Sequence, residues 1–144
     1  MMDLSGSMKK KVVAAAWIFV VVAAVSGIQA VADAIPKHAF DMSWPDHARF
    51  HLTVGAANQL GFAVMTMLVA LIPFRRGERW SWWALLGFAL LSFMVLVPAS
   101  VWHGSDPPPG AWLLIGACIA AMLLALLLTL EIGLRGADHR SAGR

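Results

Sequence analysis

The sequence predicts an all-α fold, a four-helix transmembrane bundle with both termini cytoplasmic, and three observations support this class. The chain has 144 residues, of which 60% are hydrophobic and only 13% charged, whereas a water-soluble domain of this size needs a more charged surface. It contains four apolar runs of about 20 residues, the length that crosses some 30 Å of hydrocarbon as a helix. The basic residues gather on one side of these runs. We therefore expect residues 1–144 to form a single integral membrane domain.

The four spans are expected at roughly residues 12–32, 52–74, 80–101 and 111–130. They should be helices, because lipid offers no hydrogen-bond partners for the open edges of strands. Residues 106–110 read DPPPG, a stiff turn that cannot continue a helix, so the third span should end before it.

Two proline signals refine these limits. Before the second span, Ser43 can cap a helix, Pro45 is tolerated in a first turn, and Asp46 completes a capping box. The second helix is therefore expected to start near residue 44, about two turns before its apolar stretch. In the third span, Pro98 removes a backbone hydrogen bond near the outer end, so we expect a kink there and a splayed outer half of the bundle.

Positive charges predict the orientation of the spans. Nine of the eleven Lys and Arg residues lie before the first span, between the second and third, or after the fourth. By the positive-inside rule these segments are cytoplasmic, which makes the chain a multi-pass protein of the plasma (inner) membrane. The formal net charge of +3 follows from this topology and does not imply nucleic-acid binding. A cleavable signal peptide ending at residues 32–34 is a rival interpretation, opposed by the length of the apolar run and by Pro36.

Polar groups concentrate on the opposite, extracytoplasmic side, most densely at residues 44–51, which read WPDHARFH. His47 and His51 are four residues apart, and Asn58 follows His47 by eleven residues, close to three helical turns. At roughly 100° per residue these three side chains share a face about 40° wide. Arg49 should point almost the opposite way and reach lipid phosphate or water.

Other polar groups join this face if the spans pack as an antiparallel bundle. On the first span, Ser26, Gln29 and Asp33 share a stripe toward the same outer end, and His103 leaves the third span there. Polar groups within spans need partners, so Gln29, Asp33, Asn58 and Gln59 are expected to hydrogen-bond one another. The adjoining loops add His38, Asp41 and Asp106.

The histidines permit several kinds of chemistry. An H-x-x-x-H pair suits Zn²⁺ or Cu²⁺ because it places two imidazoles on one side of a helix, and the candidate metal ligands are His47, His51 and His103. Haem held between His51 and His103 is a second arrangement, although no attachment motif is present. For acid–base catalysis the candidates are His47, His51 and Asp33, and the sequence leaves open whether the chain is an enzyme. Histidines bonded to lipid headgroups or loop carbonyls are the alternative without chemistry. Further metal ligands would have to come from His103, His38, Asp41 or Asp33.

Three other features have a structural interpretation. Glu131 is expected to form an ion pair with Arg135, four residues later. The lone Cys118 excludes an intramolecular disulfide. Small residues spaced four apart let membrane helices approach closely. They recur at Ala23/Gly27, Ala57/Gly61 and Gly116/Ala120.

The segment W-P-x-H-A-R-F-H at residues 44–51 resembles one in small four-span bacterial integral membrane proteins, a resemblance that implies the topology and no activity. The layout is also loosely similar to the emopamil-binding/sigma-2 group, whose bundles hold sterol-like ligands against buried His and Glu. No glutamate lies near His47 or His51, and Glu131 is expected at the opposite end. The similarity therefore implies only that such a bundle can hold a lipophilic ligand.

The sequence thus predicts a small integral membrane protein that binds a lipophilic small molecule or a metal ion at an extracytoplasmic-side pocket. The expected ligand-binding residues are His47, His51, Asn58, Gln29 and His103. The alternative is a non-catalytic accessory or assembly subunit of a larger membrane complex, in which the same polar groups bind headgroups or a partner's loop. Expected partners are membrane lipids, a lipophilic ligand, and a homo-oligomer or larger membrane complex, without nucleic acid.

Overall fold

The computed structural model describes residues 5–103 and 109–134, which are helical apart from short connections and contain no strand. The predicted all-α class is therefore confirmed. In chain order the elements are α1 (Gly6–Gln29), η1 (Ala30–Ala39), α2 (Asp46–Val69), η2 (Ala70–Phe74), α3 (Arg79–His103), α4 (Pro109–Leu128) and α5 (Leu130–Leu134).

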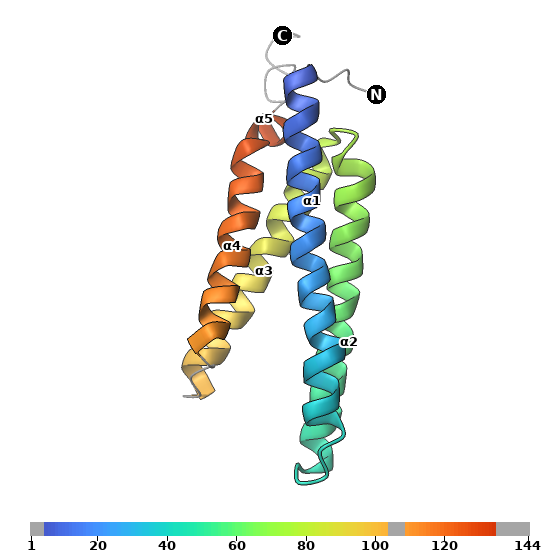
Figure 1. Ribbon diagram of the computed structural model, residues 1–144, viewed down its shortest axis with the longest axis vertical. Coiled ribbons are helices and arrows are strands. Elements are labelled where there is room, and N and C mark those ends of the chain that lie inside the picture. The colour runs from blue at the N-terminus through green and yellow to red at the C-terminus, as the bar shows by residue number, and fades with distance from the viewer. Residues whose placement is uncertain (1–4, 104–108, 135–144) are drawn as a thin grey trace, which may run out of the picture.

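The chain runs up and down along one long axis (Figure 1). Helix α1 continues without a break into η1, and α2 continues into η2, so these two units form an antiparallel hairpin that turns at residues 40–45. We call this turn, with the adjoining ends of η1 and α2, the hairpin tip. The start of α1, the turn at residues 75–78 and α5 lie at the opposite end, which we call the closed end (Figure 1).

Both long helices end in a π-helical segment that contains a proline, Pro36 in η1 and Pro73 in η2. Proline cannot donate the backbone hydrogen bond of a regular α-helix, and its ring crowds the carbonyl one turn earlier, so a wider turn there is physically reasonable. Two helices are long and apolar enough to cross a membrane, Gly6–Lys37 and Asp46–Phe74, and Leu113–Leu128 is a shorter apolar helix.

The core lies at the closed end, where all four long helices meet. Its largest fully buried apolar side chains come from different elements, among them Phe19 of α1, Phe74 of η2, Leu85 of α3 and Ile132 of α5. The rings of Phe19 and Phe74 meet edge to face with their centroids 6.2 Å apart. Such interlocking contacts between elements distant in sequence fix the position of each helix at this end.

Polar contacts reinforce the closed end. The Trp82 indole Nε1 donates to the Leu126 carbonyl at 3.2 Å, and the Arg79 Nε donates to the Gly133 carbonyl at 3.0 Å. A Cβ built on Gly133 would lie 2.6 Å from the Trp82 ring, so only glycine lets the ring approach this closely. These contacts tie the start of α3 to α4 and α5.

The turn between η2 and α3 depends on Gly77. Its φ of 74° is in the left-handed region that glycine adopts without strain. The Gly77 amide donates to the Phe74 carbonyl at 2.9 Å, and the Glu78 amide donates to the Pro73 carbonyl at 3.1 Å. These bonds satisfy carbonyls that the ending helix leaves open, and they permit a four-residue reversal.

Away from the closed end, the two helix pairs diverge. Figure 1 shows the far ends of α3 and α4 lying apart from the tip of the α1–α2 hairpin. Helix α3 remains helical through Pro98 to His103. The η1 segment contacts α1 and α2, the two arms of its own hairpin. The hairpin tip therefore lacks the four-helix packing of the closed end.

Candidate binding site at the hairpin tip

Asp41 organises the turn that leads into α2. Its carboxylate Oδ1 accepts hydrogen bonds from the Ser43 amide at 2.9 Å and from the Ser43 hydroxyl at 2.7 Å. The Trp44 amide donates to the Asp41 carbonyl at 3.2 Å, which closes a four-residue turn. Helix α2 then starts at Asp46, with Pro45 as the residue before it.

The predicted capping box is therefore wrong. The Ser43 hydroxyl bonds Asp41 instead of the start of α2, and no side chain caps that helix. The start at Asp46 lies two residues beyond the expected position near residue 44. Ser43 takes part in an Asx-type turn instead of a helix cap. The Asp41 carboxylate, two residues earlier, can accept hydrogen bonds from both the amide and the hydroxyl of Ser43.

Arg49 connects the turn to the first residues of α2. Its guanidinium pairs with Asp46, and its Nη1 donates to the Met42 sulfur at 2.8 Å. The Arg49 side chain is only 21% exposed, whereas that of Asp46 is 93% exposed. The expectation that Arg49 reaches out to phosphate or water is therefore wrong, because the turn covers it. Its Nε is buried and has no partner among the described residues.

His47 and His51 are in direct contact on the exposed face of α2. Their Nε2 atoms lie 3.1 Å apart, and the rings meet edge to face with centroids 4.3 Å apart. This distance is that of a hydrogen bond, in which either imidazole can be the donor. The structure thus brings together the two histidines that the sequence placed on one side of a helix.

Asn58 lies on the same stripe, two turns further along α2, and its side chain is exposed. No hydrogen bond or ion pair joins it to any residue that the structure describes. Gln29 on α1 is likewise exposed and without a polar partner in the described chain. These two amides therefore do not satisfy each other as expected.

Gln59 makes the polar link between the two arms of the hairpin. Its Nε2 donates to the Ser26 carbonyl at 3.0 Å and to the Ser26 hydroxyl at 3.1 Å. The expected partners of Gln59 were Gln29, Asp33 and Asn58, so the described contact corrects that prediction. Nearby, the Gly27 backbone approaches Ala63 so closely that an added Cβ would lie 3.4 Å from its methyl group. Close backbone approach here allows the link.

Toward the tip, α3 no longer covers the side of α2 that carries the histidines. Phe62 contacts Phe88 of α3 edge to face, with centroids 5.9 Å apart. Asn58 lies one turn before Phe62 on the same side of α2, and His51 lies about two turns further toward the tip. Both are exposed, because α3 and α4 diverge from the hairpin there (Figure 1).

The remaining predicted site residues are not joined to the histidine pair by any described contact. The side chains of Asp33, His38 and His103 lie outside the described part of the structure, as does all of Asp106. Helix α3 ends at His103, on the pair of helices whose far ends lie apart from the tip. The partner predicted for Glu131, Arg135, also lies outside the described residues.

The described geometry offers two metal ligands and not three. Among the residues described, no group of three His, Cys, Asp or Glu side chains is placed to hold one ion. The spacing of the two Nε2 atoms is compatible with one shared metal ion. Two bonds of about 2.05 Å, typical of Zn–N, drawn to nitrogens 3.1 Å apart enclose about 98°, between the octahedral and tetrahedral ligand angles.

A second surface feature, which the sequence did not suggest, lies at the closed end. It is a shallow open groove of about 360 Å³ between the closed-end part of α2–η2 and the start of α3. The Trp80 indole closes one side by donating to Glu78 at 2.7 Å, and Arg76 lies 4.0 Å from the same carboxylate. Its lining residues are Leu68, Val69, Ile72, Pro73, Arg76, Glu78 and Trp80.

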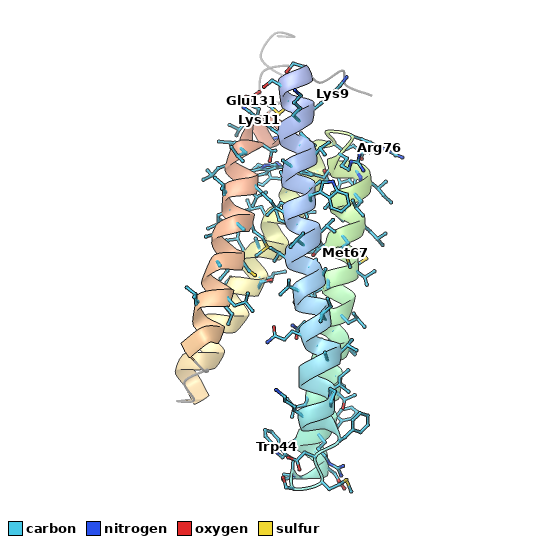
Figure 2. The ribbon with its side chains drawn as sticks, viewed as in Figure 1. Lys9, Lys11, Trp44, Met67, Arg76 and Glu131 are labelled. Atoms are coloured by element: carbon cyan, nitrogen blue, oxygen red, sulfur yellow. The ribbon has the colours of Figure 1, made fainter. Side chains whose placement is uncertain are left out.

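The side chains at the tip all come from the two arms of the hairpin and the turn between them (Figure 2). Trp44 marks this end, far from Lys9, Lys11 and Arg76 at the closed end. Sequence reasoning found the histidine pair and missed the roles of Asp41 and Arg49. The D-x-S spacing at residues 41–43 was the signal for the first, and none was available for the Arg49–Met42 contact.

A scan of protein-family models and searches of curated proteins and of solved structures found no match to the chain. The resemblances drawn from residues 44–51 and from the layout therefore stay predictions.

Proposed function

We propose that the chain is a small multi-pass protein of the plasma membrane. The best apolar stretch of helix Gly6–Lys37 is only 33% buried inside the structure, and that of Asp46–Phe74 only 28%. The core helix of a water-soluble protein would be mostly buried. Large apolar side chains instead face outward along both helices and along α4, and a surface of that extent suits lipid and not water.

In this proposal α1, α2, α3 and α4 are four spans with both termini in the cytoplasm. The up-and-down path supports this, and so does the charge distribution. The described basic residues of the closed end are Lys9, Lys10, Lys11, Arg75, Arg76 and Arg79, whereas the described hairpin tip contains only Lys37 and Arg49. The positive-inside rule then assigns the closed end to the cytoplasm and the tip to the outer face.

The function that the tip supports best is binding of a metal ion or of a lipophilic molecule with a polar end. The observation that carries this proposal is the exposed His47–His51 contact, with Nε2 atoms 3.1 Å apart. An imidazole nitrogen can ligate a metal, bind a polar headgroup or transfer a proton, so the pair suits each of these roles. The exposed amides of Asn58 and Gln29 can orient such a ligand.

Purification tests the proposal. The protein, extracted in mild detergent, is analysed for bound metals by elemental mass spectrometry and for bound lipids by lipid mass spectrometry. We expect a bound species that is lost in His47→Ala and His51→Ala. It should be retained in the control His139→Ala, which removes a histidine that follows the last span in the sequence. An empty wild-type protein, or a species that both tip variants retain, would contradict binding at the tip.

An accessory or assembly subunit is the second candidate, and a specific observation favours it. The glycines Gly55 and Gly61 of α2 and Gly116 of α4 face open space, with no atom within 4 Å of an added Cβ. Exposed small residues on membrane helices are typical of surfaces that pack against other helices. A different membrane protein that co-purifies in a fixed ratio would support this candidate over ligand binding.

A further inference from the structure

One face of the α2–η2 helix has the residue spacing of a helix–helix interface along its whole length. Its members alternate four and three residues apart, the repeat that keeps a seam facing a partner helix. All of them are exposed in the single chain. The α2 seam consists of His47, His51, Val54, Asn58, Gly61, Met65, Leu68 and Ile72.

The composition of the α2 seam differs from that of two apolar faces on the neighbouring helices. One face of α1 presents Trp17, Val21 and Ile28, and the second half of α4 presents bulky leucines such as Leu124 and Leu127. Such faces are suited to lipid chains. The α2 seam instead interrupts its apolar residues with two histidines, an asparagine and a glycine. Polar and small residues are the ones that favour contact between membrane helices.

Asn58 indicates that the helix packed against the α2 seam is a second copy of α2. It occupies the position of the repeat where a single asparagine fixes register between paired helices. An amide carries both a donor and an acceptor, so it is complementary to a second copy of itself. In a lipid-facing position Asn58 would have no partner, since no described residue bonds it. A twofold axis beside α2 would place two such amides opposite each other.

Gly61 gives the space that this contact needs. It lies one turn beyond Asn58 on the α2 seam, and a Cβ built there would meet nothing within 4 Å. Glycine at such a position lets two helix backbones approach closely. Met65, which follows on the seam, has an unbranched and adaptable side chain suited to filling an irregular interface.

At the tip, the same contact would complete the metal site. One chain supplies two imidazoles with Nε2 atoms 3.1 Å apart, and no third ligand among its described residues. His47 and His51 occupy consecutive layers of the seam, so a parallel partner adds two more imidazoles at the same height. Four imidazoles satisfy the tetrahedral coordination of Zn²⁺.

We propose that two copies of the chain associate in parallel through their α2 seams, and that His47 and His51 of both copies form a shared site for a divalent metal such as Zn²⁺. The metal site rests on the function proposed above, whereas the helix contact does not. The twofold axis runs along the membrane normal, because both copies cross the membrane in the same orientation.

Cysteine crosslinking in native membranes tests the helix contact. In a Cys118→Ser background, single cysteines replace Val54, Met65 or Leu68 on the α2 seam, and matched controls replace Val21 on α1 or Leu124 on α4. We expect disulfide-linked dimers at the seam positions and about tenfold less at the controls. Equal crosslinking on all faces, or none at the seam, would overturn the proposal.

Asn58→Ala separates a register-fixing contact from chance collision. Loss of one interhelical hydrogen bond should weaken dimerisation, measured by fluorescence energy transfer in detergent dilution, by roughly tenfold. The control Leu124→Ala should leave dimerisation unchanged. Dimerisation that is equally strong in both variants would remove Asn58 from the interface and contradict the register proposed.

Metal stoichiometry distinguishes the two parts of the proposal. We expect one Zn²⁺ for two chains, abolished by the double change of His47 and His51 to Ala, while the seam cysteines still crosslink. Seam crosslinks without Zn²⁺ binding would overturn the shared site and the metal-binding function but keep the interface. One Zn²⁺ for each chain without seam crosslinks would overturn the interface and keep metal binding.

Discussion

The closed end and the hairpin tip are built from the same helices but in opposite ways. At the closed end, elements distant in sequence interlock, with Phe19 against Phe74 and Trp82 against Gly133. At the tip, contacts join residues close in sequence, such as Asp41 with Ser43 and Arg49 with Asp46, and polar side chains stay uncovered. Packing at the closed end fixes the helices, while the hairpin tip exposes polar side chains that can bind a ligand.

This difference implies a division of labour. Substitutions at the closed end should lower the stability of the whole fold, because each removes contacts among several helices. Substitutions of the exposed tip histidines should spare stability and change binding. The free energy of unfolding, measured by titration with SDS in mild detergent micelles, tests that division.

The largest effect is expected for Phe19→Ala. The Phe19 side chain is fully buried at the meeting point of α1 and η2, so its truncation should leave a cavity and cost about 3 kcal/mol of stability. The control Phe40→Ala removes a ring that is 72% exposed in the tip turn and should change stability by less than about 0.5 kcal/mol. Similar costs at both sites would contradict a core confined to the closed end.

A smaller loss is expected for Gly133→Ala. The added methyl group would lie 2.6 Å from the Trp82 ring, and overpacking of this kind costs about 1–3 kcal/mol. Gly116→Ala on α4 is the matched control, because nothing lies within 4 Å of its added Cβ. There alanine should be neutral or slightly stabilising, as in an ordinary helix. A neutral Gly133→Ala would mean that Trp82 does not pack as described.

The smallest effect distinguishes the two neighbouring amides of α2. Gln59→Leu removes the bonds to Ser26 and should cost about 1 kcal/mol. Asn58→Leu removes an amide without a described partner, so a dilute, monomeric sample should keep its stability. A larger loss from Asn58→Leu than from Gln59→Leu would show that Asn58 has a partner within the chain.

The sequence predicted the helical class and the histidine pair well, because both depend on local information. Apolar run length predicts long helices, and four-residue spacing brings His47 and His51 together whatever the rest of the chain does. Details that depend on competing partners were predicted less well. Ser43 could hydrogen-bond either the start of a helix or Asp41, and Arg49 could face either water or a folded turn. Only the three-dimensional path of the tip determines which partner each side chain has.

Long-range arrangement was the least predictable part. Convergence of His103 on the histidine pair assumed a uniform antiparallel bundle, whereas the far ends of α3 and α4 lie apart from the tip (Figure 1). Similarly, the small pair Ala23/Gly27 is buried against α2, while Gly61 and Gly116 of the equivalent pairs face open space. Spacing within one helix does not tell which face a neighbouring helix will cover.

Metal binding by the histidine pair is tested by a calorimetric titration of the purified, metal-free protein with Zn²⁺ in mild detergent at neutral pH. Binding should be saturable in the wild type and in His139→Ala, and it should weaken at least about tenfold in both His47→Ala and His51→Ala. Equal affinity in all four proteins, or no binding in the wild type, would contradict metal binding by the histidine pair at the hairpin tip.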